Sequence, residues 1–423
     1  MISRFKTRTF AWLTGVALTL VAGSMFVFSG AQAQNKEPIK IGFSMSLTGP
    51  LSANGKQALL GMQIWEEETN AKGGLLGRPV KLIYYDDKST AAEAPGIYTK
   101  LLDVDKVDLI LGPYATVPAA AAMTVAVQRK KVFQILFGLD VNSEFKYDRF
   151  FAMIPTGPNT KPSFTEGFFE AAAQQNPKPQ TVALAFADAE FAQNACEGAR
   201  VNAKKHGIKV IYDKSYPPAT VDYSPIVRAI QATNPDVVLL ASYPPDSVGM
   251  VRAATEIGLR TQLFGGAMVG MQYASLIGQL SEKLNRVVNY HFFVPSPKMS
   301  FPGIEDFLKK YQARAKDSGV DPLGFYQPPF AYAAMQILEQ AIKATGTLDD
   351  DKLADYIHKN TFKTIVGDVR FNELGEWADP RVIMVQFQNI QGAGLEQYMT
   401  GHKQVIVYPN DLKDGDLEYP FSK

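Results

Sequence analysis

The sequence contains one cysteine, Cys196, in 423 residues, which excludes an internal disulfide. A chain of this length can bury enough apolar surface to fold without covalent cross-links. Cys196 lies in a segment whose apolar residues have helical spacing, so we expect a buried, unreactive thiol rather than a reactive one.

Signatures of catalysis are also missing. The chain has no G-x-S-x-G motif, no phosphate-binding P-loop and no C-x-x-C pair. Asp86 and Asp87 stand between a predicted strand and a predicted helix, where capping and the helix dipole explain two carboxylates better than catalysis does. The histidines are scattered, which favours structural roles for all of them: His206, His291, His358 and His402. We therefore predict a protein that is not an enzyme and carries no metal or other cofactor.

An excess of one charge is missing as well. The formal net charge is +1, and no basic stripe interleaved with aromatic residues runs along the chain, so a nucleic-acid partner is not expected. The one long apolar run follows Arg4, Lys6 and Arg8 and ends in the small residues Ala31 to Ala33. This pattern is typical of a secretory signal peptide, residues 1–33, cleaved after Ala33. An uncleaved membrane anchor is the alternative, but the small residues favour cleavage and export.

What the sequence does contain is a regular alternation of short β-branched runs and longer helical patterns from Ile39 onward. Strands that alternate with helices in this way predict parallel sheets joined by right-handed crossovers. The alternation restarts after RFFAMIPTGPNTKP, a segment rich in proline and glycine, which indicates two lobes rather than one large sheet. The last segments, RVIMVQFQNI and KQVIVYP, alternate as antiparallel strands do. The predicted fold class is α/β.

One strand-to-helix junction stands out, in the stretch LILGPYATVPAAAA from Leu109 to Ala122. Gly112 ends an apolar strand, and Pro118 stands where the first turn of a helix accepts proline, which makes Thr116 the expected N-cap. The carboxyl edge of a parallel sheet is where open α/β folds bind ligands. Free N–H groups and the helix dipole favour an anion there, although a plain capped helix accounts for the same motif.

The order of these segments resembles a known family. The opening IKIGFSMSLTGPLSANGKQALLGMQIWEEETNAKGGLLGRPVKLIYYDD is followed by VDLILGPYATVPAAAA, FGGAMVG and GDVRFNELGEW. This ordered set is similar to type I periplasmic binding proteins, of the subfamily that serves branched-chain amino acid ABC transporters. The resemblance runs from Ile39 to about Pro409 and rests on the whole set, since each motif alone is weak.

The resemblance implies two Rossmann-like lobes, joined by a three-segment hinge, that close on a small ligand. Lobe 1 would comprise residues 34–154 and 290–368, and lobe 2 would comprise residues 155–289 and 369–423. The chain would cross between them near Ile154, Tyr290 and Val369. The expected location is the periplasm, and the expected partners are a small-molecule ligand and the membrane permease subunits of an ABC transporter.

The resemblance also implies a set of ligand-binding residues. The turn that holds the ligand carboxylate in this family matches Tyr114 to Thr116. The aligned motifs contribute, in chain order, Leu51 and Ser52, then Tyr114, Ala115 and Thr116, then Gly138 and Leu139, then Phe191, Tyr243 and Met268.

One departure from the family bears on the ligand. Relatives that bind amino acids often hold the ammonium group with an acidic residue in the turn that matches FGGAMVG, and here Met268 fills that position. Burying an unpaired ammonium is costly. We therefore expect a carboxylate ligand without an α-amine, preferably an aromatic or other apolar acid, unless Asp188 or Glu190 replaces the missing partner. Aromatic residues such as Tyr114 and Phe191 suit a flat ligand.

Three other functions stay open at this point. A branched-chain or other amino acid, an amide or a urea could be the ligand of a protein with the same architecture. A sensory receptor ectodomain would need a membrane anchor or a partner, and a cleaved leader argues against the anchor. A secreted enzyme would need a constellation of histidines or carboxylates in the cleft, and the motifs provide none.

Overall fold

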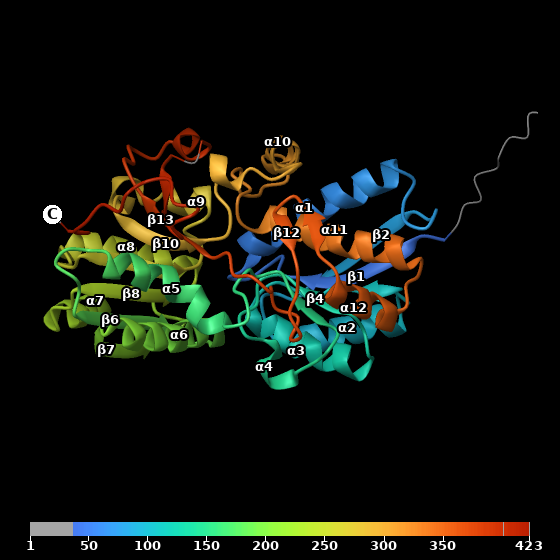
Figure 1. Ribbon diagram of the computed structural model, residues 1–423, viewed down its shortest axis with the longest axis horizontal. Helices are drawn as coiled ribbons and strands as arrows, with labels where there is room; N and C mark the ends of the chain where they lie inside the picture. The colour runs from blue at the N-terminus through green and yellow to red at the C-terminus, as the bar shows by residue number, and fades with distance from the viewer. Residues whose placement is uncertain (1–36, 401, 423) are drawn as a thin grey trace, which may run out of the picture. The chain divides into compact units, whose positions relative to one another are not determined.

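The computed structural model describes residues 37–400 and 402–422, so the predicted signal peptide and its cleavage site lie outside the described residues. These residues form an α/β fold, as the alternation of strands and helices predicts (Figure 1). Within the described part of the chain, no helix combines the length and apolar character needed to cross a membrane.

One group of elements is built around a parallel sheet near the amino terminus. It comprises β1 (Ile39–Met45), α1 (Ser52–Ala71), β2 (Val80–Asp86), α2 (Ala94–Asp103), β3 (Leu109–Ile110), α3 (Thr116–Gln128), β4 (Phe133–Ile135), α4 (Asn142–Phe145), β5 (Phe150–Ala152), α10 (Ile304–Ala315), α11 (Gln327–Thr345), α12 (Asp350–Lys359), β11 (Phe362–Thr364) and β12 (Gly367–Val369). The sheet has the order β2-β1-β3, and β4 and β5 form a separate parallel pair. Helices α1 and α11, far apart in sequence, pack against each other (Figure 1).

The other group is built around a seven-stranded sheet with the order β14-β13-β10-β9-β8-β6-β7. It comprises α5 (Thr160–Ala173), β6 (Thr181–Ala187), α6 (Glu190–His206), β7 (Lys209–Tyr216), α7 (Ser224–Ala232), β8 (Val237–Ser242), α8 (Pro244–Ile257), β9 (Leu263–Met268), α9 (Ala274–Ile277), β10 (Val287–His291), β13 (Ile383–Phe387) and β14 (Gln404–Tyr408), with short 3₁₀ turns at Ser281–Leu284, Pro297–Met299 and Leu395–Tyr398. Strands β6 to β10 are parallel, whereas β13 and β14 are antiparallel, as the sequence predicts.

The chain passes between the two groups of elements three times. It leaves the first group after β5, returns to it after β10, and leaves it again after β12. The crossings expected near Ile154, Tyr290 and Val369 stay predictions, as do the exact lobe boundaries and the hinge motion.

The paired carboxylates Asp86 and Asp87 hold the loop after β1 against the end of β2. Asp87 is buried and accepts hydrogen bonds from the hydroxyls of Ser44 and Ser46, at 3.0 and 2.7 Å. Asp86 accepts one from the backbone N–H of Leu47 at 2.9 Å. Their partners are therefore loop and strand groups, and the loop they hold in place leads into α1.

Three other candidates for chemistry, Cys196, His291 and His358, have buried or hydrogen-bonded side chains. Cys196 is buried in α6, and burial raises the pKa of its thiol. His358 lies 2.7 Å from the carbonyl oxygen of Asp148, and burial lowers the pKa of His291 to about 3, which keeps that ring neutral. Among the described residues, no three side chains of the metal-binding types come together.

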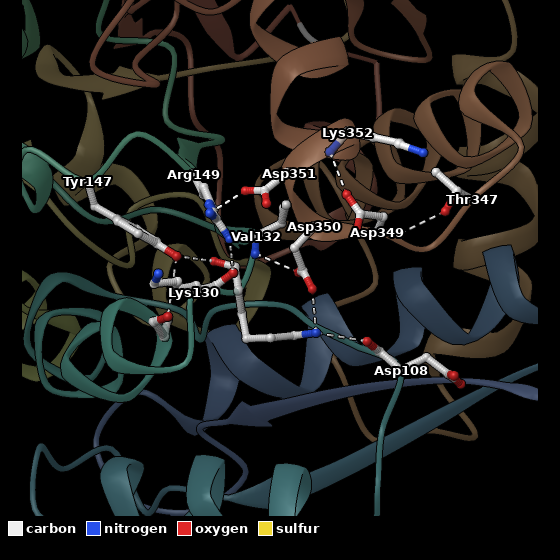
Figure 2. A network of polar contacts seen from close by, with 12 residues as sticks. Asp108, Lys130, Val132, Tyr147, Arg149, Thr347, Asp349, Asp350, Asp351 and Lys352 are labelled. Atoms are coloured by element: carbon white, nitrogen blue, oxygen red, sulfur yellow. Dashed lines mark hydrogen bonds and ion pairs between the residues drawn. The ribbon is translucent and has the colours of Figure 1, made fainter.

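A polar network ties α12 to the strand region of the first group (Figure 2). One carboxylate oxygen of Asp350, in the first turn of α12, accepts a hydrogen bond from the backbone N–H of Val132 at 2.8 Å. The other lies 2.6 Å from the ammonium of Lys131, and both side chains are mostly buried. The neighbouring Asp351 pairs with Arg149, but its side chain is 71% exposed. Of these two neighbouring acids, Asp350 is therefore the one whose contacts with the first group are buried.

We predict that Asp350→Ala lowers the free energy of unfolding by about 1–3 kcal/mol, because it leaves the amide of Val132 without its acceptor. Asp351→Ala is the matched control in the same helical turn and should change stability by no more than about 0.5–1 kcal/mol, since exposed ion pairs contribute little. Urea unfolding of the two variants measures the difference, and equal losses would contradict the assignment.

Candidate functional site

A cavity of about 450 Å³ lies where the carboxyl ends of strands from both groups of elements meet the starts of their helices. The first group contributes the loop after β1 and the start of α3. The second contributes the starts of α6 and α8 and the loop after β7. Seven of the predicted ligand-binding residues line this cavity: Leu51, Tyr114, Ala115, Thr116, Leu139, Phe191 and Tyr243. Their role in binding stays a prediction.

Ser52, Gly138 and Met268 were also predicted, but they do not line the cavity. Ser52 is the first residue of α1 and directly follows Leu51, which does. A Cβ at Gly138 would lie 2.8 Å from a side-chain carbon of Ile135, so its backbone packs into the core instead. Met268 ends β9 with its side chain fully buried, and the next residue, Val269, faces the cavity.

The structure adds lining residues that the motifs did not indicate. Tyr290 lies in β10, where a crossing was predicted, and Tyr326 immediately precedes α11, so the fold brings them to the cavity from distant parts of the sequence. The loop after β7 contributes residues 218–221, of which Val221 is 92% exposed. The proline pair in this loop was the one available sign that its backbone is held in a defined turn.

The start of α3 differs from the expected capped helix. Thr116 is the first helical residue rather than the N-cap, and the N-cap position is held by Ala115 with no side-chain cap. The hydroxyl oxygen of Thr116 instead accepts a hydrogen bond from the backbone N–H of Leu139 at 3.0 Å. Pro118 has no N–H, so the open amides of this helix are those of Thr116 and Val117.

Ala115 has a backbone conformation that glycine normally adopts. Its φ is 77° and its ψ is 154°, a region that costs a residue with a Cβ about 1–3 kcal/mol. Its N–H donates to the carbonyl oxygen of Phe137 at 3.0 Å, which holds the strained residue in place. The strained residue makes the turn into α3, and residues 115–118 line the cavity.

Five helices begin at the cavity, because the N-cap residues of α1, α3, α6, α8 and α11 all line it, and these helices differ in charge. The first turn of α6 contains Glu190 and that of α8 contains Asp246, whereas the first turn of α3 contains no acidic residue. A helix start carries about half a positive charge, which a nearby carboxylate compensates. The positive end of α3 is therefore uncompensated, as are those of α1 and α11, whose first turns also contain no acidic residue.

Asp246 is the one ionisable acid among the described lining residues, and none of those residues is Lys, Arg or His. Its carboxylate accepts hydrogen bonds from the hydroxyls of Tyr223 and Tyr216, at 3.0 and 3.3 Å, and contacts the backbone N–H of Tyr243 at 3.5 Å. Burial raises the pKa of Asp246. The lining contains neither Asp188 nor Glu190, the two residues that the sequence leaves open as alternative partners for an ammonium group.

The remaining walls are largely aromatic. The rings of Phe191 and Tyr243 meet edge to face with centroids 5.9 Å apart, and Phe164 lies 5.3 Å from Phe191 on the same side. On the other side, Phe137 packs against Tyr326 at 5.1 Å. Walls of this kind suit a flat apolar body.

The chain matches the family model described as periplasmic binding protein over residues 38–390. The Leu/Ile/Val-binding protein homolog 7 of Brucella abortus is 26% identical over 334 residues, which cover 77% of this chain and 82% of the relative.

Two solved structures share the fold. The branched-chain amino acid transporter substrate binding protein LivJ from Streptococcus pneumoniae, in complex with isoleucine, has a TM-score of 0.72 at 20% identity over 84% of this chain and 97% of that chain. A solute binding protein of an ABC transporter from Rhodopseudomonas palustris HaA2, in complex with p-hydroxybenzoic acid, has a TM-score of 0.70 at 20% identity, over 84% of this chain and 94% of that one. At this level of identity, the likeness to solved structures shows the fold.

The strained conformation at Ala115 leads to a prediction. Ala115→Gly should raise the free energy of unfolding by about 1 kcal/mol, because the relief of strain exceeds the added entropy of the unfolded chain. Ala121→Gly, in the interior of α3, is the matched control and should lower stability by about 1 kcal/mol. Thermal unfolding compares the two variants, and a loss of stability in both would show that Ala115 is unstrained.

Proposed function

The chain belongs to the periplasmic binding protein family, and on that premise we propose that it captures an aromatic or other apolar carboxylate without an α-amine for an ABC importer. Members of this family bind solutes rather than transform them. The observation that carries the proposal is the uncompensated start of α3, which faces a cavity whose lining is otherwise mostly apolar.

The start of α3 offers a carboxylate three donors. Two are the backbone N–H groups of Thr116 and Val117, which precede the first hydrogen bond of the helix, from Ala119 to Ala115. The third is the hydroxyl of Thr116. Its oxygen accepts a hydrogen bond from the backbone N–H of Leu139, so its hydrogen points away from that amide and can be donated to another acceptor. A carboxylate bound here also gains from the helix dipole.

The remainder of the cavity favours an aromatic body. Phe191 and Tyr243 from one side, and Phe137 and Tyr326 from the other, provide ring faces and edges. The Rhodopseudomonas palustris protein of the same fold is in complex with p-hydroxybenzoic acid, which supports an aromatic acid as the class of ligand. We further propose that the two lobes predicted from the sequence close over this ligand by a hinge motion. The closed protein would then present the ligand to permease subunits in the periplasm.

An amino acid is the second candidate, and the names of the Brucella abortus and Streptococcus pneumoniae proteins favour it. An ammonium group in this cavity would need a carboxylate partner to offset its desolvation. Asp246 is the candidate, but two tyrosine hydroxyls and a backbone N–H already occupy its oxygens. We therefore rank the amino acid, amide and urea ligands below the aromatic acids, and a sensory receptor ectodomain below both.

The proposal predicts the outcome of a calorimetric ligand panel with benzoate, hydroxybenzoates, leucine, phenylalanine and urea. Aromatic acids should bind at least about tenfold more tightly than the amino acid with the same ring, because the ammonium would be buried without a free partner. Tight binding of leucine or phenylalanine, with no binding of the aromatic acids, would reject the proposal in favour of the second candidate.

Substitutions at Thr116 test whether the ligand carboxylate binds at the start of α3. Thr116→Ala should weaken the binding of an aromatic acid by about 1–3 kcal/mol, the contribution of a hydrogen bond to a charged group. Thr116→Ser retains the hydroxyl and is the matched control, with an affinity close to that of the unaltered protein. Equal affinity in both variants would place the carboxylate elsewhere in the cavity.

A further inference from the structure

The cavity has an exposed part and a deeply buried part, and tyrosine side chains line the buried part. The exposed part lies at Val221, which is 92% exposed, whereas Ile154, Tyr290 and Tyr326 in the buried part are at most 2% exposed. Hydroxyl groups gather in and beside this buried part from four tyrosines of separate elements: Tyr114, Tyr273, Tyr290 and Tyr326. We call these four residues the tyrosine cluster.

The hydroxyls of the cluster form a connected network. Those of Tyr290 and Tyr326 lie 2.6 Å apart, so one donates to the other and the pair retains one hydrogen for a further acceptor. The hydroxyl of Tyr114 accepts a hydrogen bond from the side-chain amide of Asn54. The ring of Tyr273 packs against that of Tyr326 with centroids 5.8 Å apart.

Buried polar groups in and beside the cluster lack hydrogen-bond partners, and they belong to residues that do not themselves line the cavity. Among the described residues, the hydroxyl of Tyr273, the side-chain oxygen of Asn54 and both amide atoms of Gln327 are buried without a partner. Gln327 begins α11 next to Tyr326 and lies near the hydroxyl of Tyr114. Native proteins normally satisfy such groups, because each buried polar atom left unpaired costs free energy.

The chemistry of the cluster defines the group that it would recognise. Hydroxyls and amides both donate and accept, so together they complement a neutral group that does the same. A second carboxylate is disfavoured, since no Lys, Arg or His is among the described residues that line the cavity. An apolar substituent is also disfavoured, because it would exclude water from these groups without replacing its hydrogen bonds.

We propose that the tyrosine cluster is a second binding subsite, which accepts a hydroxyl group on the ring of the ligand. The preferred ligands are then hydroxylated aromatic acids, held by their carboxylate at the start of α3 and by their hydroxyl in the buried part. This inference rests on the proposed function, because it assumes that an aromatic carboxylate occupies the cavity.

The test compares benzoate, 3- and 4-hydroxybenzoate and 4-methylbenzoate by calorimetry with the exported protein. The better hydroxybenzoate should bind about tenfold or more tightly than benzoate, and 4-methylbenzoate, which fills similar space, should show no such gain. In Tyr326→Phe and Tyr290→Phe the preference for the hydroxyl should fall to about threefold or less.

Tyr311→Phe is the matched control. Tyr311 is fully buried in α10, its hydroxyl donates to the carbonyl oxygen of Asp321 at 3.0 Å, and it does not line the cavity. This variant loses a buried hydroxyl as the others do, but it should keep the full preference for the hydroxylated ligand. Thermal unfolding of all variants identifies any that fail to fold, and one folded cluster variant is sufficient for the comparison.

The outcomes separate the two proposals. Equal binding of benzoate and the hydroxybenzoates, or a preference that persists in both cluster variants, overturns the subsite and leaves the aromatic carboxylate in place. Binding of leucine without binding of any aromatic acid overturns the proposed function, and the subsite with it.

Discussion

The open positive end of α3, turned toward an apolar cavity, is the constraint on which the proposed site depends. Three local features hold it there. The strained backbone of Ala115 makes the turn, the bond from the amide of Leu139 fixes the hydroxyl of Thr116, and Gly112 lets the preceding strand approach β4. A Cβ at Gly112 would lie 2.3 Å from a methyl group of Ile135, so a larger residue would displace the whole turn. The stability of this junction and the anion binding proposed for it are therefore linked.

The fold was predictable to the extent that it follows from local patterns. The alternation of strands and helices indicates parallel sheets, and the last two segments read correctly as antiparallel strands because their residues alternate with a period of two. The junction at Leu109 to Ala122 was also identifiable, since glycine and proline restrict the backbone there. The role of Thr116 was not, because the N-cap depends on the backbone angles of Ala115, which an alanine does not reveal.

The site was less predictable than the fold, for geometric reasons. Adjacent residues at the end of a strand point to opposite sides of the sheet. Met268 was predicted to bind the ligand, but the next residue, Val269, is the one that lines the cavity. Tyr290 and Tyr326 meet only when the chain crosses between the groups of elements, and no motif marks a contact between such distant segments. Asp246 is three residues from Tyr243, which was predicted to bind the ligand. Asp246 itself was not predicted, because its partners Tyr216 and Tyr223 come from other parts of the chain.

A cavity that binds an anion without a cationic side chain has a physical advantage. An arginine in these apolar surroundings would be a buried and unpaired charge whenever the ligand is absent, and its desolvation would oppose the fold. The amides at the start of α3 are held by the helix itself, so their partial charge requires no partner in the unliganded protein. The same arrangement limits the ligand, because about half a unit of positive charge offsets a single carboxylate only in part and leaves nothing for a second one. A neutral group at the tyrosine cluster is consistent with that limit, since it adds specificity through hydrogen bonds without adding charge.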